Sequence, residues 1–235
     1  SDIDNVHIPY EWFDIDVESV NAYCKETDKF VLSGFCARPF ERLQFIRGTA
    51  PFYMDLVLKP DGMTEFMKTL HKFNMDLMEA WAKTDVDSLF MMDDWGAQNN
   101  LLISPDMWIE TFKPMYRDYC DIAKAYGKKM FMHSDGNILK IYPHLIEIGV
   151  DALNSQIFCM GFENLSEFAG KITFWGEIDR QHMLVDKTPA DIDESIHQIR
   201  DLLWKDGGCI AQCEFGPGGK PENVEQVFES WNKVI

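Results

Sequence analysis

The fold is decided by the stretch Lys129-Met130-Phe131-Met132-His133-Ser134-Asp135-Gly136. Its apolar residues run without the alternation of a half-exposed strand, which is typical of a strand buried on both faces of a parallel sheet. The imidazole of His133 and the carboxylate of Asp135 come directly after these apolar residues. Five other short apolar runs of the same character predict further strands: Lys29–Phe35, Val86–Met92, Asp151–Gln156, Ile172–Trp175 and Gly208–Cys213.

Helical patterns separate these runs. Proline stands near the first turn of several of them, where its missing N–H costs nothing, and Gly127, Gly149 and Gly207 stand where helices should end. Strand alternating with helix at this spacing predicts βα units. We expect the helices over Pro60–Lys83, Pro105–Tyr126, Ile138–Ile148, Glu163–Gly170, Pro189–Lys205 and Pro221–Val234, with a short one over Val17–Lys25.

Two architectures are built from βα units, a doubly wound open sheet and a (β/α)8 barrel of the TIM type. A wound sheet that binds a nucleotide predicts a glycine-rich turn after an early strand, and the sequence has none there. The segment Gly216-Pro217-Gly218-Gly219 follows the last strand and lacks the Lys-Ser/Thr of a P-loop. A barrel predicts polar residues at the carboxyl ends of successive strands, and the sequence favours it.

Polar side chains do end five consecutive strand runs, which predicts an active site on one rim of the barrel. A helix cap explains any single carboxylate, and a core hydrogen bond explains a lone histidine, but neither explains five strand ends in a row. The rim residues, in chain order, are Asp93, Asp94, Trp95, Gln98, His133, Asp135, Asn154, Gln156, Trp175, Glu177, Arg180 and Cys213.

The net charge and the cysteine content indicate which kinds of partner and which cell compartment the sequence favours. The chain has 235 residues, with 39 acidic and 22 basic side chains and a formal charge of −17. Such a surface repels phosphate backbones and anionic lipids, so we expect neither nucleic acid nor membrane as a partner. Its 6 cysteines are scattered, which favours reduced thiols and a cytoplasmic protein over a disulfide framework.

Many short blocks together resemble the uroporphyrinogen decarboxylase superfamily. They are Asp93-Asp94-Trp95-Gly96, Ile103-Ser104-Pro105, Lys113-Pro114, Gly127-Lys128, His133-Ser134-Asp135-Gly136, Gly149-Val150-Asp151, Gly176-Glu177-Ile178-Asp179 and Pro221-Glu222-Asn223-Val224. The resemblance runs from about Phe30 to the carboxyl end. It implies a (β/α)8 barrel in a single domain over residues 1–235.

The barrel that this resemblance implies is amino-terminally incomplete here, because the sequence shows six candidate strands. Residues 1–27, an irregular and helical segment, stand where the first strand or two belong. An open barrel wall would leave unpaired strand edges and apolar surface. We therefore expect either a homodimer or residues 1–27 packed across the gap.

The superfamily holds decarboxylases and zinc-dependent methyltransferases that act on corrinoids or thiols, and its methyltransferase branch resembles this chain through a metal set of His-x-Cys and a distant Cys. His133 matches the histidine and Cys213 the late cysteine, whereas Asp135 stands where the middle cysteine belongs. Zinc also accepts carboxylate oxygen. Glu177 could be a fourth ligand, a general base, or the ion-pair partner of Arg180. His133 and Cys213 can also be explained as core residues, the first as a hydrogen-bonded imidazole and the second as a buried thiol.

We therefore expect a metal-dependent methyltransferase that moves a methyl group between a small molecule and a corrinoid or thiol acceptor, with the corrinoid on a partner protein. The metal, zinc or another divalent ion, would be held by His133, Asp135, Glu177 and Cys213. The alternatives are a uroporphyrinogen decarboxylase-like lyase and a non-catalytic ligand-binding barrel. The expected catalytic residues are Asp93, Asp135 and Glu177, and the expected substrate-binding residues are Asp94, Trp95, Gln98, Asn154, Gln156, Trp175 and Arg180.

Overall fold

The structure, a computed structural model, describes residues 5–234. It is an α/β fold in which the strands follow the order of the sequence, β1 to β6. Pairing is parallel between β1 and β2, β4 and β5, and β5 and β6. Every predicted strand is confirmed, with small shifts at the ends. The strands are β1 (Leu32–Ala37), β2 (Ser88–Met92), β3 (Lys129–Ser134), β4 (Ala152–Ser155), β5 (Thr173–Glu177) and β6 (Cys209–Gln212).

The described chain forms two compact units. The first comprises residues 5–94 and 106–131, and the second comprises residues 95–105 and 132–234. The single barrel domain expected over residues 1–235 stays a prediction. Within residues 5–234, no helix combines the length and the apolar character that crossing a bilayer requires.

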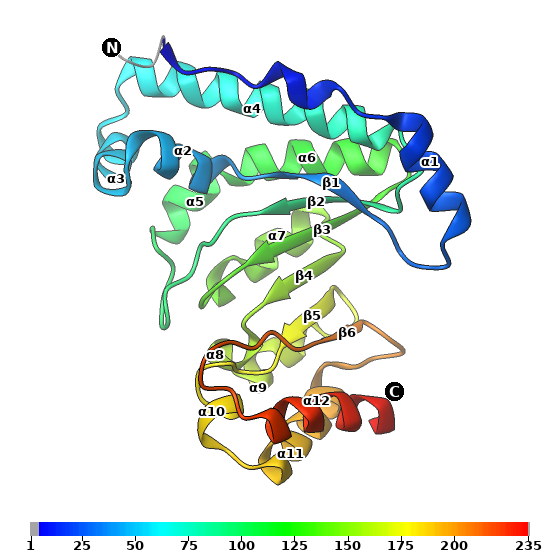
Figure 1. Cartoon of the computed structure of the whole chain (residues 1–235). Coiled ribbons are helices and arrows are strands. Elements are labelled where there is room, and N and C mark those ends of the chain that lie inside the picture. Colours follow the sequence, from blue (N-terminus) through cyan, green and yellow to red (C-terminus); the bar gives the residue numbers. More distant parts are fainter. Residues whose placement is uncertain (1–4, 235) are drawn as a thin grey trace. The chain divides into compact units, whose positions relative to one another are not determined.

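Helix α4 (Asp61–Ala82) organises the first unit. Its buried side chains Met63, Phe66, Leu70 and Phe73 recur at alternating three- and four-residue spacing, the stripe of an amphipathic helix. This stripe packs on β1 and β2, and α4 lies beside α6 (Figure 1). The other helices of the unit are η2 (Tyr10–Phe13), α1 (Val17–Glu26), α2 (Pro39–Arg47), α3 (Thr49–Leu58), α5 (Pro105–Thr111) and α6 (Lys113–Ala125).

Helices α2 and α3 were not predicted from the sequence. Gly48 joins them with a φ of 85°, a left-handed backbone that favours glycine. The helices escape prediction because their apolar residues do not form one stripe, and Met54, Val57 and Leu58 of α3 are exposed. The predicted helix over Pro105–Tyr126 is in fact two, α5 and α6, with Phe112 between them.

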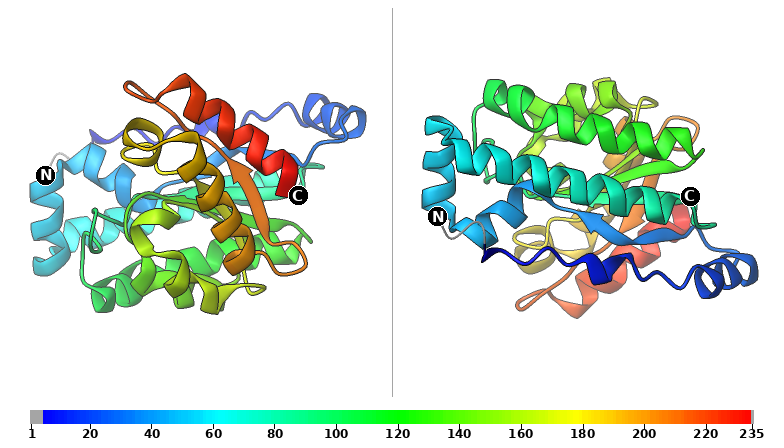
Figure 2. Two further views of the ribbon diagram at one scale, coloured as in Figure 1. Left: turned by 90° about the horizontal axis from the view of Figure 1, so that it is seen from below. Right: turned by 90° about the horizontal axis from the view of Figure 1, so that it is seen from above.

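The amino-terminal segment packs on the rest of this unit through an aromatic turn, η2, and α1 adds a hydrogen bond from the Asp85 N–H to Asn21 Oδ1. The ring centroid of Phe73 in α4 lies 5.7 Å from that of Phe13 and 6.1 Å from that of Trp12, and Trp12 also lies 6.3 Å from Phe35 of β1. Figure 2 (right) shows this segment running alongside β1. The packing of residues 1–27 across the gap in the barrel wall stays a prediction, and residues 1–4 of that segment lie outside the described residues.

Asp93, which we expected to be catalytic, is fully buried and holds the first turn of α2. Its carboxylate accepts hydrogen bonds from the backbone N–H groups of Phe40 at 3.0 Å and Glu41 at 2.7 Å. The Tyr116 hydroxyl donates to it at 2.5 Å. Burial outweighs these bonds and raises the pKa of Asp93 to about 8. Because both oxygens serve helix α2 and Tyr116, the carboxylate is a structural anchor.

The second unit contains the strands β4, β5 and β6 and the helices that follow them. Asn154 is the register partner of Trp175, and Glu177 is that of Gln212. Helices α11 and α12 pack side by side (Figure 2, left). The helices are η3 (Leu139–Ile141), α7 (Tyr142–Ile148), α8 (Ile157–Met160), α9 (Phe162–Leu165), η4 (Ser166–Phe168), α10 (Met183–Asp186), α11 (Pro189–Leu203) and α12 (Pro221–Val234).

Two loops of this unit cross at a pair of glycines. The Gly96 N–H donates to the Asp135 carbonyl at 3.0 Å, and the Asn137 N–H donates to the Ala97 carbonyl at 2.8 Å. A Cβ on Gly136, whose φ is +78°, would lie 2.2 Å from the Gly96 carbonyl carbon. The crossing therefore requires glycine, and it fixes the loop that carries Asp135.

We predict that Asp93→Asn removes a pH-dependent part of the stability. The folded-state pKa of about 8 lies above the unfolded value, so the contribution of Asp93 is complete below about pH 4 and is lost as the pH rises through about 8. The stability advantage of wild type over the variant should shrink by on the order of 1 kcal/mol per pH unit between about pH 5 and pH 8. Urea unfolding across this range measures it.

The matched control for this prediction is Asp76→Asn. The Asp76 side chain is 42% exposed and pairs with Lys72 at 2.6 Å on the surface of α4. At neutral pH, Asp76→Asn should change the free energy of unfolding by no more than about 1 kcal/mol, the size of a surface ion pair. A profile of unfolding free energy against pH for Asp93→Asn that runs parallel to that of wild type would contradict the buried-acid interpretation.

A second prediction concerns the glycine crossing. Gly136→Ala should lower the free energy of unfolding by at least about 2 kcal/mol, because backbone atoms of Gly96 must move. Gly127→Ala is the control, since Gly127 also has a positive φ, +68°, but a Cβ there would meet nothing within 4 Å. It should cost only about 1 kcal/mol of backbone strain. Equal losses in thermal or urea unfolding would refute the steric argument.

Candidate active site

The site lies in the second unit, at the carboxyl ends of its strands. His133 belongs to β3, and Asp135, two residues after His133, comes directly after the end of that strand. Residues at this spacing share a face of a strand. The His133 Nε2 atom lies 3.6 Å from Asp135 Oδ1, and both side chains are mostly buried, with 16% and 28% of their surface exposed. The sequence prediction that these two groups converge is therefore confirmed by the structure.

Asn154, at the end of β4, determines the tautomer of His133. Its amide NH2 donates to the Trp175 carbonyl at 2.8 Å and to Gln212 Oε1 at 2.7 Å, so both donors are used. Its Oδ1 lies 2.5 Å from His133 Nδ1 and must accept a hydrogen bond from it. His133 Nδ1 therefore carries hydrogen, and Nε2 is the atom that faces Asp135.

Gln212, the last residue of β6, links this amide to Glu177 on β5. Its Nε2 donates to Glu177 Oε1 at 3.4 Å. Glu177 is only 4% exposed. Burial, together with the negative charge of Glu214, raises the pKa of Glu177 to about 7, against the opposing effect of Arg180.

Arg180 closes the arrangement with ion pairs to three carboxylates. Its guanidinium lies 3.0 Å from Glu177, 3.0 Å from Asp135 and 2.5 Å from Glu214. The pairing of Glu177 with Arg180, one of the alternatives left open by the sequence, is thus confirmed. Three acidic groups share one cation, so the neighbourhood of Arg180 carries net negative charge whenever the carboxylates are ionised.

These contacts form one closed circuit, which we call the polar ring. It runs from His133 through Asn154, Gln212, Glu177 and Arg180 to Asp135 and back to His133. Its members come from the ends of β3, β4, β5 and β6 and from the loops that follow β3 and β5. Each side chain is therefore held by two neighbours, which preorganises the site.

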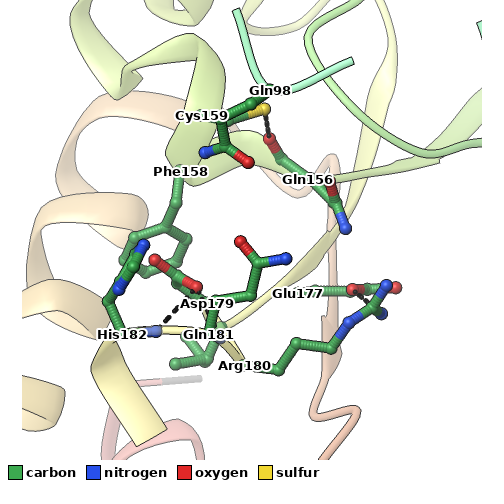
Figure 3. A pocket seen from close by; sticks show the side chains of 10 residues that line it. Gln98, Gln156, Phe158, Cys159, Glu177, Asp179, Arg180, Gln181 and His182 are labelled. Atoms are coloured by element: carbon green, nitrogen blue, oxygen red, sulfur yellow. Dashed lines mark hydrogen bonds and ion pairs between the residues drawn. The ribbon is translucent and has the colours of Figure 1, made fainter. Parts of the chain in front are cut away.

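A pocket of about 200 Å³ opens beside the polar ring, with Glu177 and Arg180 in its wall. Figure 3 shows the side chains of Gln98 and Gln156 across from Asp179 and Arg180. The Asp179 carboxylate accepts the backbone N–H groups of Gln181 and His182 and so shapes the floor. The remaining lining residues are Phe158, Cys159, Ile178, Gln181 and His182.

The structure brings together only part of the predicted site. Gln98, Gln156, Glu177 and Arg180 line the pocket, and Asn154 stands behind it in the polar ring. Trp95 is fully buried and its backbone N–H donates to Ser134 Oγ at 3.1 Å, so its side chain is part of the core. Trp175 is half-buried on β5 outside the lining, and Asp94 belongs to the first unit.

The four expected metal ligands do not form one compact group. Within the second unit, the ligand atoms of His133 and Asp135 lie close enough together to hold a single ion. Glu177 and Cys213 do not belong to this pair. Glu177 is bound by Arg180 and Gln212 instead, and Cys213 is a half-buried thiol whose pKa is raised by burial and by nearby Glu177.

Sequence reasoning missed Gln212 and the far wall of the pocket. Gln212 is adjacent to Cys213, and only the family pattern favoured the cysteine. The strand register pairs Gln212 with Glu177, so knowing that register would have identified it. Phe158, Cys159 and Gln181 lie in segments after the strand ends, and no signal in the sequence marked them.

Solved structures show the same fold at low identity. A methyltransferase from Methanosarcina mazei matches with a TM-score of 0.70 and 15% identity over 92% of this chain and 63% of its own. The 3-keto-D-glucoside 4-epimerase YcjR from E. coli matches with a TM-score of 0.54 and 14% identity, over 95% of this chain and 85% of its own. The IOLI protein, solved with a zinc atom, matches with a TM-score of 0.50 and 12% identity, over 96% of this chain and 84% of its own.

These neighbours are TIM-barrel enzymes, so the predicted fold class is confirmed. This chain spans 63% of the length of the methyltransferase, which agrees with a partial barrel. No curated protein sequence matches the chain. The sequence model described as "Uroporphyrinogen decarboxylase (URO-D)" matches residues 1–234, almost the whole chain, and confirms the predicted resemblance. The chain therefore belongs to the uroporphyrinogen decarboxylase family.

Proposed function

We propose that this chain takes part in metal-dependent methyl transfer, moving a methyl group between a small molecule and a thiol or corrinoid acceptor. Members of the family are enzymes, either decarboxylases or methyltransferases. One observation carries the choice of a metal site: the Nε2 atom of His133 faces the Asp135 carboxylate at 3.6 Å.

Neutral His133 would place a lone pair opposite a carboxylate oxygen. Its Nδ1 hydrogen is used by Asn154, so Nε2 has no hydrogen to offer unless the ring is an imidazolium. Two electron-rich atoms at this distance repel each other, and a cation between them removes the repulsion. A histidine whose far nitrogen donates to an amide oxygen is the usual arrangement behind a metal ligand.

The donor set fits zinc or another divalent ion. Imidazole nitrogen and carboxylate oxygen both bind zinc, and harder ions also accept the carboxylate. His133 and Asp135 would supply two ligands, which leaves positions for water, substrate or other groups of the protein. Such an ion, when bound, would lower the pKa of a thiol or water attached to it and so supply a nucleophile near neutral pH.

The chain's own groups have separable roles in this proposal. Glu177, with a pKa of about 7, can accept or release a proton at the pocket wall. Arg180 holds Glu177 and Asp135 in place. Gln98 and Gln156 offer amide groups to a polar substrate, and the pocket volume of about 200 Å³ suits a small one.

The pocket argues against the decarboxylase alternative. A porphyrinogen is a large polyanion, whereas this pocket is small and its single arginine is already shared by Asp135, Glu177 and Glu214. In a decarboxylase, Asp93 or Asp135 would pair with a pyrrole N–H, and of these two carboxylates Asp93 is buried under α2. The corrinoid partner protein and a homodimer remain parts of the proposal.

A two-arm assay distinguishes the candidate functions. One arm supplies zinc, methylcobalamin and a small thiol and follows the loss of methylcobalamin absorbance; the other supplies uroporphyrinogen and measures released carbon dioxide. We expect turnover in the first arm alone. Turnover in the second alone supports the lyase, and turnover in neither supports a ligand-binding barrel. Either result refutes methyl transfer by this chain.

The metal prediction uses zinc and three variants. Wild type should retain about one zinc per chain after dialysis, while His133→Ala and Asp135→Ala should lose it with little change in thermal unfolding. Cys213→Ser is the matched control and should keep its zinc. Elemental analysis measures the content. Loss of zinc in Cys213→Ser would restore the four-ligand site, and no zinc in wild type would remove the metal from the proposal.

A further prediction tests the role of Asn154 behind the metal. Asn154→Ala frees His133 Nδ1, so the ring no longer has a fixed tautomer or orientation. Zinc affinity should fall by about 10- to 100-fold, as for other residues that orient a ligand. Competition with a chelating dye measures it. Gln98→Ala, in the pocket wall but outside the polar ring, should leave zinc affinity unchanged; equal affinities in all three proteins would count against the role of Asn154.

A further inference from the structure

The first unit contains a cavity that the proposed active site does not use. Its volume is about 230 Å³, and it lies between the aromatic turn η2, the end of β1 and helices α2 and α4. The walls are apolar and largely aromatic, formed by Trp12, Phe35, Phe66, Leu70 and Phe73. The Trp12 ring, 6.1 Å from Phe73 and 6.3 Å from Phe35, covers one side.

Two arginines line the same cavity. Arg38 stands at the start of α2 and Arg42 one turn later, so the two guanidinium groups share a helix face. Arg38 has one distant carboxylate, Glu41, at 3.9 Å. Arg42 lies 5.5 Å from the centroid of the Trp12 ring, and within residues 5–234 it has no ion pair with a carboxylate. Like charges at this spacing repel each other.

The other polar groups of the cavity add no negative charge. None of its described lining residues is Asp or Glu, although acidic side chains outnumber basic ones by 39 to 22 in the chain. Burial raises the pKa of the Cys36 thiol to about 12, which keeps it neutral. Asn74 is buried and donates to the Tyr119 hydroxyl at 3.3 Å. The cavity is therefore a local positive site with apolar walls.

We propose that this cavity binds a small apolar acid, with its anionic group between Arg38 and Arg42 and its hydrocarbon body among Trp12, Phe35 and Phe73. An anion there relieves the repulsion between the two arginines and gains charge-assisted hydrogen bonds. The volume is below the roughly 300–1,000 Å³ of drug-sized sites, so the body is one or two rings or a short chain. This site is independent of the methyl-transfer proposal.

Isothermal titration with 2-naphthoate and its neutral counterpart 2-naphthamide tests the proposal on the whole chain. We expect one naphthoate per chain, bound at least about tenfold more tightly than the amide, because only the acid engages the arginines. Arg42→Gln and Arg38→Gln should each weaken naphthoate about tenfold towards the level of the amide and leave the amide unchanged. The difference between acid and amide should shrink as salt is added.

Two further variants keep the test decisive. Arg200→Gln changes an exposed arginine on α11, outside the cavity, and should bind naphthoate as wild type does. Leu70→Trp fills the cavity from α4 and should abolish binding of both probes, provided that its circular dichroism and melting match wild type. Absence of naphthoate binding, equal binding of the amide, or unchanged binding in Arg42→Gln would each overturn the proposal.

Discussion

The amide of Asn154 is the contact on which the rest of the candidate site depends. With both of its donors engaged by the Trp175 carbonyl and Gln212, its oxygen has to accept from His133, and this single orientation determines which nitrogen faces Asp135. The contact exists because β4, β5 and β6 pair in a fixed parallel register. A slip of one residue in β4 would turn Asn154 to the other face, and the polar ring would open.

Most of the sheet was predictable from the sequence, and the physical reason is burial. A strand such as β3 has a run of consecutive apolar residues, Met130 to Met132, because both of its faces are covered, so it stands out from the helices around it. Helices α2 and α3 were not predictable, because α3 exposes Met54, Val57 and Leu58 and has no single apolar stripe.

The candidate site was predictable as a set of residues but not as a set of contacts. Sequence position shows that a carboxylate follows a strand, yet it does not show what that carboxylate binds. Asp93 and Asp135 illustrate the difference, since the first supports helix α2 and the second faces His133. Gln212 was not among the predicted site residues, because its pairing with Glu177 depends on strand register, and register depends on partners far away in the sequence.

The polar ring also has a direction. His133 donates to Asn154, Asn154 to Gln212, and Gln212 to Glu177, where Arg180 donates as well, so hydrogen-bond donors converge on one carboxylate. Amide groups do not give up their protons at neutral pH, so they hold Glu177 without titrating with it. In the proposed function, a proton that Glu177 gains or releases would therefore pass through the pocket, whose wall this residue forms. The polar ring thus surrounds Glu177 with hydrogen-bond donors on the side of the protein interior, and the other side of Glu177 faces the pocket.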